Sequence, residues 1–187
     1  DPRVRIESAV ENIGATGNFR RAFDLAEGEY FMWASGHDLW SSGLVSECVE
    51  LLQQHPDACL AYASCEWIGP DGEPFNRESG WYDTRGMAAP GRFFTVLWGN
   101  MHPVLGVIRS SRLRECGPVP ALIGGDLVIL ADLSLRGSFL HAARSRWSRR
   151  ELRAEVEYRQ KLKRYSSVSF GITRSPLAKV FPLLELP

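Results

Sequence analysis

Long apolar runs, a net charge of either sign and the common nucleotide or nucleophile signatures are all missing from this sequence. No apolar stretch approaches the ~20 residues that a membrane-spanning helix needs, and no signal peptide is visible. The 22 Lys and Arg residues balance the 22 Asp and Glu residues, so no strong electrostatic field favours the binding of nucleic acid. No P-loop, G-x-G-x-x-G, H-E-x-x-H or G-x-S-x-G pattern occurs. We therefore expect neither a spanning helix nor a nucleic-acid partner.

Cysteine is scarce: it occurs at positions 48, 59, 65 and 116, and no two of these form a C-x-x-C pair. Two of the cysteines lie inside apolar stretches. We expect buried free thiols, in preference to a zinc site or a disulfide framework. Free thiols persist in a reducing environment, which favours a cytoplasmic location.

The apolar periodicity predicts strands that alternate with helices in one domain. The chain has 187 residues, of which 44% are hydrophobic and 24% charged, an ordinary balance for a globular fold. Runs of strand length occur at 30–34, 58–68, 104–108 and 139–142. Helical spacing occurs at 16–26, 42–54, 93–98, 110–116 and 127–135. Strands separated by helices favour an α/β fold with a mostly parallel sheet.

Two segments depart from this alternation. Residues 72–90 form a Gly-rich polar stretch, long enough for a functional flap. Residues 146–187 are expected to form a helical or irregular extension to a domain that spans 1–145. The basic run from Arg144 to Arg164 is most simply the solvated face of a helix. The alternative is contact with an anionic lipid surface, which would be peripheral association with the inner face of the membrane.

The first candidate site is Ser35-Gly36-His37-Asp38, directly after the predicted strand at 30–34. In open α/β sheets, ligands bind just beyond the carboxyl ends of the strands. Asp38 and His37 are residue types that ligate a divalent cation, and such a cation can neutralise a diphosphate leaving group. The structural alternative is that Asp38 only caps or turns into the next helix.

A second candidate is Asp126, which follows Gly124-Gly125 and precedes an apolar helix. A carboxylate in this place can act as a general base for an attacking hydroxyl, and the glycines allow an acceptor to approach the backbone closely. The alternative is a purely structural carboxylate, stabilised by the free N–H groups at the start of the helix. His102, at a strand entry, is a third candidate that contacts an acceptor or a phosphate, or else has a structural role.

Four segments, in this order, resemble the family 2 glycosyltransferases. The first is Glu11-Asn12-Ile13-Gly14-Ala15-Thr16-Gly17-Asn18-Phe19 with Leu25-Ala26-Glu27-Gly28-Glu29-Tyr30-Phe31, and the second is Trp33-Ala34-Ser35-Gly36-His37-Asp38-Leu39-Trp40. The third is Gly106-Val107-Ile108-Arg109 with Leu113 and Gly117, and the fourth is Gly125-Asp126 with Leu130-Ala131-Asp132-Leu133-Ser134-Leu135-Arg136-Gly137. The resemblance implies the GT-A fold, a Rossmann-like sheet flanked by helices.

The resemblance also implies an inverting sugar transfer. Asp126 would be the catalytic base, with His102 and Gly125 on the acceptor side, and Asn12, Gly14 and Asn18 on the donor side. Mn²⁺ or Mg²⁺ near Asp38 and His37 would stabilise the departing diphosphate. The implied donor is a nucleotide sugar, a UDP-sugar first of all, and the implied acceptor is a glycan, a lipid-linked sugar or a small molecule. Bacterial cell-surface polysaccharide assembly is the usual context of such enzymes.

The sequence departs from the family pattern in two places. Ser35-Gly36-His37 replaces the usual Asp-x-Asp, which leaves Asp38 from the acidic cluster and predicts a weaker magnesium site. The family also begins with a βαβ unit that holds the nucleotide, and the resemblance implies that this unit is absent from the chain. A catalytically inactive binding or assembly module is therefore the alternative to an active transferase.

Overall fold

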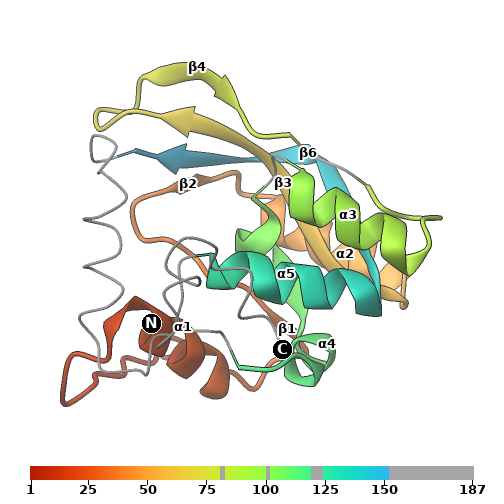
Figure 1. Ribbon diagram of the computed structural model, residues 1–187. Helices are drawn as coiled ribbons and strands as arrows, with labels where there is room; N and C mark the ends of the chain where they lie inside the picture. Colours follow the sequence, from red (N-terminus) through yellow and green to blue (C-terminus); the bar gives the residue numbers. More distant parts are fainter. Residues whose placement is uncertain (81–82, 100–101, 119–123, 152–187) are drawn as a thin grey trace, which may run out of the picture.

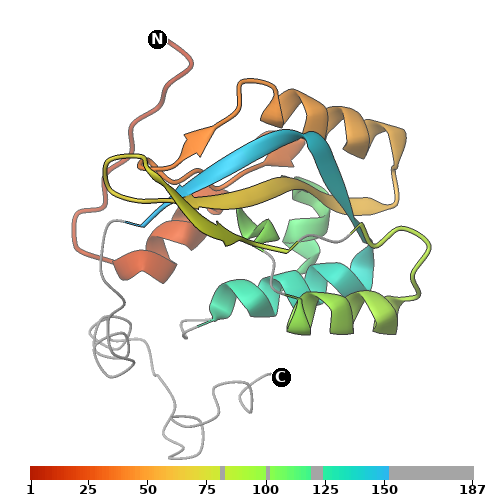
Figure 2. The ribbon, with the colours of Figure 1, turned by 90° about the horizontal axis from the view of Figure 1, so that it is seen from above.

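The computed structural model describes residues 1–80, 83–99, 102–118 and 124–151. Six strands of this part of the chain form one sheet in the order β1-β5-β3-β6-β2, with β4 beside β3. They are β1 Tyr30–Phe31, β2 Leu39–Trp40, β3 Ala58–Ile68, β4 Pro74–Glu78, β5 Val107–Arg109 and β6 Ser138–Arg150. Helices cover both faces of the sheet (Figures 1 and 2). The expected α/β class with flanking helices is confirmed.

The two long strands, β3 and β6, form the centre of the sheet and run parallel. Their register extends from Ala58 opposite Ser138 to Ile68 opposite Arg150. The other strand pairs are antiparallel, so the sheet is mixed where the sequence predicted a mostly parallel one. A tight turn at residues 69–72 causes part of this difference, because strands joined by a short turn can pair only antiparallel.

The helices divide between the two faces of the sheet. They are α1 Gly14–Asp24, α2 Leu44–Gln54, α3 Ala89–Trp98, α4 Ser110–Glu115 and α5 Gly125–Arg136, with a 3₁₀ turn, η1, at Pro103–Leu105. Figure 2 shows α2 on one face, and α3 and α5 side by side on the other. Each face has its own apolar core.

Strand β3 supplies both cores because its side chains alternate. Leu60 and Tyr62 point to the core beneath α5, whereas Ala61 and Ala63 point to the core beneath α2. A strand buried on both faces reads as a continuous apolar run. This is why the sequence predicts β3 with the same bounds, 58–68, that the structure shows.

Strand β6 corrects two predictions. It runs through Ser138–Arg150, whereas the sequence predicted a strand only over 139–142, and its basic residues lie in a strand and not on a helix face. Side chains in β6 alternate, with Ser145 and Trp147 buried and Arg146 exposed between them. The density of arginines hides this period of two. The rest of the predicted basic helix face, from residue 152 to residue 164, lies outside the described residues.

Two other segments differ from expectation. The predicted strand at 104–108 is split into η1 and β5, because Pro103 begins a 3₁₀ turn with a fixed φ. The long polar stretch at 72–90 contains β4, which adds an edge to β3. The helices predicted at 42–54, 110–116 and 127–135 are confirmed as α2, α4 and α5, with ends shifted by one or two residues.

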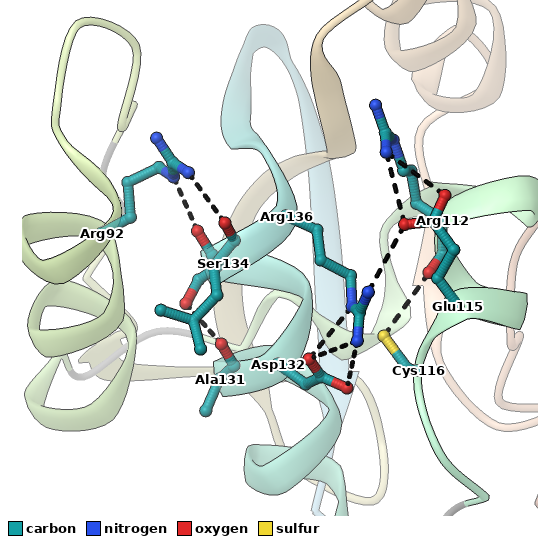
Figure 3. Close-up of polar contacts among 9 residues, drawn as sticks. Arg92, Arg112, Glu115, Cys116, Ala131, Asp132, Ser134 and Arg136 are labelled. Atoms are coloured by element: carbon teal, nitrogen blue, oxygen red, sulfur yellow. Dashed lines mark hydrogen bonds and ion pairs between the residues drawn. The ribbon is translucent and has the colours of Figure 1, made fainter.

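Helix α5 is fastened at its carboxyl end by neighbouring helices (Figure 3). The guanidinium of Arg92, on α3, donates to the backbone oxygens of Ser134 at 2.6 Å and of Leu135 at 3.2 Å. Arg136 bonds Asp132 at 3.0 Å within α5 and reaches Glu115, at the end of α4, at 3.4 Å. These contacts fix the position of α5, and therefore of Asp126 in its first turn.

The cysteines are free, as predicted, and three of them are buried. Burial raises the pKa of the Cys48 thiol to about 12 and that of Cys59 to about 11. None of the helices in the described residues is both long and apolar enough to cross a bilayer.

Candidate functional site

A pocket of about 720 Å³ lies between α1, the segment before β2, the beginning of α5 and the end of β6. Six of the eight residues that the sequence singles out line this pocket: Asn18, His37, Asp38, His102, Gly125 and Asp126. They come from four separate segments of the chain, which the fold brings together around one pocket.

Asn12 and Gly14 do not line the pocket. The side-chain oxygen of Asn12 accepts a 2.9 Å hydrogen bond from the backbone N–H of Gly14, the first residue of α1. Their contact therefore shapes the start of the helix that carries Asn18. The indole of Trp33 donates to the backbone oxygen of Phe19 at 3.0 Å and holds α1 against the pocket wall.

Asp126 lies in the first turn of α5, and its side chain is exposed within the pocket. Gly124 precedes it with φ 85° and ψ 14°, a left-handed conformation that favours glycine. Among the described residues, no side chain forms an ion pair or hydrogen bond with the Asp126 carboxylate. This carboxylate is thus available to accept a proton from a bound hydroxyl.

Asp38 has a different environment, because its side chain is only 2% exposed. One carboxylate oxygen accepts from the indole of Trp147 at 3.0 Å, and the other accepts from the backbone N–H of Arg150 at 3.0 Å. Trp147 also stacks on Trp40, with ring centroids 5.5 Å apart. Asp38 therefore joins the segment before β2 to the end of β6.

The geometry around Asp38 shows whether these residues can bind the divalent cation that the sequence resemblance implies. Both oxygens of Asp38 already bind protein N–H groups, and the side chain of His37 is 52% exposed and contacts the Ser35 hydroxyl. Magnesium requires several oxygen ligands, and an imidazole is a poor substitute. No group of three or more His, Cys, Asp or Glu side chains with metal-binding geometry occurs in the described part of the chain. Within the described part of the chain, the residues around Asp38 do not fit a resident divalent cation.

His102 is linked to Trp67 through the hydroxyl group of Ser79. The indole N–H of Trp67 donates to the Ser79 hydroxyl at 3.3 Å, and the Ser79 oxygen lies 2.7 Å from His102 Nδ1. The Ser79 oxygen accepts from Trp67, and we assign the hydroxyl hydrogen to Nδ1, the arrangement in which the neutral imidazole carries its proton on Nε2. Burial, reinforced by the nearby Arg149 and Arg77, lowers the pKa of His102 to about 4. His102 is therefore a neutral donor in the pocket wall.

Arg149 also lines the pocket, and it is not among the residues predicted from the sequence. Its guanidinium carbon lies 4.5 Å from the ring centroid of Trp67, its register partner on β3. Arg77, on the neighbouring strand β4, stacks on the same ring at 4.0 Å. The strand periodicity of residues 138–150 is the signal that would have placed Arg149 on the pocket side of the sheet.

Comparison with known families provides independent support. The model of glycosyl transferase family 2 matches residues 1–108, which include α1, the segment before β2 and His102 but not Asp126 or Arg149. No curated protein matches the chain. The match covers more than half of the 187 residues and agrees with the α/β architecture. The chain therefore belongs to glycosyl transferase family 2.

Proposed function

We propose that the pocket binds a nucleotide-sugar donor and that the protein transfers the sugar to an acceptor hydroxyl with inversion at the anomeric carbon. Family membership supports glycosyltransferase activity in general. The observation that carries the specific proposal is the Asp126 carboxylate, which has no partner in the described residues and faces the pocket. A UDP-sugar is the first donor to test.

In the proposed reaction, Asp126 accepts the proton of the acceptor hydroxyl while the hydroxyl oxygen attacks the anomeric carbon. The new glycosidic bond forms as the bond between that carbon and the diphosphate oxygen breaks, and the electron pair leaves with the diphosphate. Attack from the face opposite to the leaving group inverts the configuration. General base catalysis of this kind contributes about 10²- to 10⁴-fold to the rate.

Gly124 and Gly125 would let the acceptor approach the base. Gly125 is buried and lines the pocket, and neither residue carries a side chain that would fill the space beside Asp126. His102 lies near enough to Asp126 for their electrostatic interaction to influence the imidazole. We therefore assign Gly125 to the acceptor side of the pocket and Asn18 to the donor side. His102 interacts electrostatically with both Asp126 and Arg149, so we place it where the acceptor and the leaving group meet.

The proposed function is tested by product analysis. The protein, with whatever residues flank this chain in nature, is incubated with UDP-glucose, UDP-galactose or UDP-N-acetylglucosamine and a panel of methyl glycosides and lipid-linked sugars. We expect release of UDP and, by NMR, a β-linked product from an α-linked donor. An α-linked product would contradict inversion, and donors that all remain intact, without even slow hydrolysis, would contradict the transferase itself. The family match does not favour the inactive module.

A further inference from the structure

Some of the charged side chains in the pocket have bonding partners, and others do not. Asp38 is bonded on both carboxylate oxygens, whereas Asp126 and Arg149 have no ion-pair partner among the described residues. A diphosphate brings additional negative charge into the pocket, and a partly buried site must supply positive charge or hydrogen-bond donors to stabilise it. Because the residues around Asp38 do not fit a divalent cation, this charge must have another source.

Arg149 differs from the other arginines at the end of β6. Arg144 pairs with Glu47 and Glu50, and Arg146 lies 3.6 Å from Glu66. The guanidinium of Arg150 donates to the backbone oxygens of His37, Gly69 and Pro70. Within the described residues, only Arg149 of these four has a guanidinium without a carboxylate or carbonyl acceptor, and it is the one that lines the pocket.

Stacking on Trp67 orients the Arg149 guanidinium without using its donors. Trp67 is 7% exposed and cannot turn freely, and the carbon of the Arg149 guanidinium lies over its ring. The N–H groups point outward from the edge of that plane, so they remain available for the oxygens of a phosphate. Arg77 stacks on the same ring but does not line the pocket.

His102 adds a second donor to this wall. Its ring meets Trp67 edge-on, with centroids 5.6 Å apart, and the Ser79 hydroxyl lies 2.7 Å from Nδ1, which leaves Nε2 as the donor when Ser79 donates to Nδ1. Trp67 thus supports two neighbouring donors, one cationic and one neutral, on the same side of the pocket. Such a pair matches the oxygens of a diphosphate in both charge and hydrogen-bonding character.

We propose that Arg149, held on Trp67 and assisted by His102, binds the donor diphosphate in place of a divalent cation, so that donor binding is independent of metal. This inference rests on the proposed function and specifies which residues of the same site bind the leaving group. The diphosphate departs as the anion of a nucleoside diphosphate, and the guanidinium offsets part of its negative charge.

Calorimetric titration of UDP, GDP and dTDP tests the proposal, on the protein with its natural flanking residues. Each nucleotide is titrated in EDTA and in MnCl₂, with uridine as the ligand that lacks phosphate. We expect a nucleoside diphosphate to bind in EDTA with the affinity it has in MnCl₂. Arg149→Ala should weaken that binding by about tenfold to a hundredfold, which corresponds to lost charge-assisted hydrogen bonds, and leave uridine unaffected.

Arg77→Ala is the matched control, because it removes the other guanidinium from the same Trp67 ring, and it should bind the diphosphate almost normally. Arg149→Lys keeps the charge but loses the planar fork, and should bind with intermediate affinity. Thermal unfolding of each variant identifies any that fails to fold.

Diphosphate binding that requires Mn²⁺, or that survives in a folded Arg149→Ala protein, would overturn the inference and leave the proposed function standing. A protein that binds none of the three diphosphates, with or without Mn²⁺, would contradict the proposed function itself.

Discussion

The indole N–H of Trp147 donates a 3.0 Å hydrogen bond to the carboxylate of Asp38, which lies 109 positions away in the sequence. The other carboxylate oxygen accepts from the backbone N–H of Arg150. Asp38 therefore holds the end of β6, and Arg149 with it, against the segment that precedes β2. The sequence suggests Asp38 as a metal ligand, but in the folded protein its carboxylate connects two segments at the edge of the pocket.

The first prediction follows from this contact. Asp38→Ala should lower the free energy of unfolding by about 3 kcal/mol, because two N–H donors lose their acceptor. Asp38→Asn keeps one carbonyl oxygen and should lose less. Urea denaturation measures both variants, and Asp71→Ala, at an exposed turn, is the control. An Asp38→Ala protein as stable as the control would show that these hydrogen bonds do not support the fold.

A second prediction concerns His102. Long-range ¹H–¹⁵N NMR of the imidazole should detect the neutral form with its proton on Nε2, down to a pH near the pKa of about 4. Ser79→Ala should allow both tautomers, whereas Ser79→Thr, which retains a hydroxyl, should restore the single one. A proton on Nδ1 in the unsubstituted protein would contradict the assignment of Ser79 as the donor to this nitrogen.

The same group has a consequence for stability. Because burial lowers the pKa of His102 from 6.5 to about 4, the unfolded chain binds the proton more readily than the folded protein does. The contribution of His102 is present above pH 6.5 and is lost as the pH falls toward 4. The unfolding free energy of His102→Gln should depend less on pH across this interval. Arg149, Arg77 and Asp126 stay unchanged in that variant, so an unaltered pH dependence would argue against a depressed pKa.

Glu47 should contribute to stability in a lower pH range. Burial by itself raises its pKa, but hydrogen bonds from Ser145 and Arg144 outweigh this and hold the pKa below the usual value of 4.5. The stabilisation is therefore complete above pH 4.5 and is lost as the pH falls below it. Glu47→Gln should remove this acid-dependent loss, measured by urea denaturation from pH 6 to 3. Glu27→Gln, at a side chain that is 91% exposed, should behave like the unsubstituted protein.

Arg92 provides a test of how α5 is positioned. Arg92→Ala removes the donors to the last backbone oxygens of α5 and should cost about 2 kcal/mol of unfolding free energy. Arg20→Ala, which removes an exposed pair with Asp24, should cost less than about 0.5 kcal/mol. Equal losses in the two variants would mean that the contacts in Figure 3 do not hold the helix.

The sequence predicted the central elements well because their physical signals are local. Strand β3 is buried on both faces, and α2 carries its apolar residues at helical spacing, so each is recognisable from neighbouring residues alone. Two of the residues that line the pocket were selected for a similar reason. Asp38 and Asp126 were selected because each lies where an element ends or begins.

The roles of these residues depended on contacts that the sequence does not reveal. Nothing near Asp38 indicates that its partners are Trp147 and Arg150. Likewise, the arginines of β6 resembled a solvated helix face until the alternation of buried and exposed side chains became visible in the strand. Arg149 was overlooked for this reason, because a position facing the pocket can be assigned only after the strand is known.

The activity of Asp126→Asn is the measurement that tests the proposed reaction most directly. The variant replaces one carboxylate oxygen with an amide and removes the base, while the exposed position should keep the melting temperature close to that of the unsubstituted protein. We predict at least about a 100-fold loss in UDP release from the UDP-sugar that the protein uses, while Asp71→Asn retains full activity. An Asp126→Asn protein with undiminished turnover would contradict the assignment of the base and, with it, the reaction proposed for this pocket.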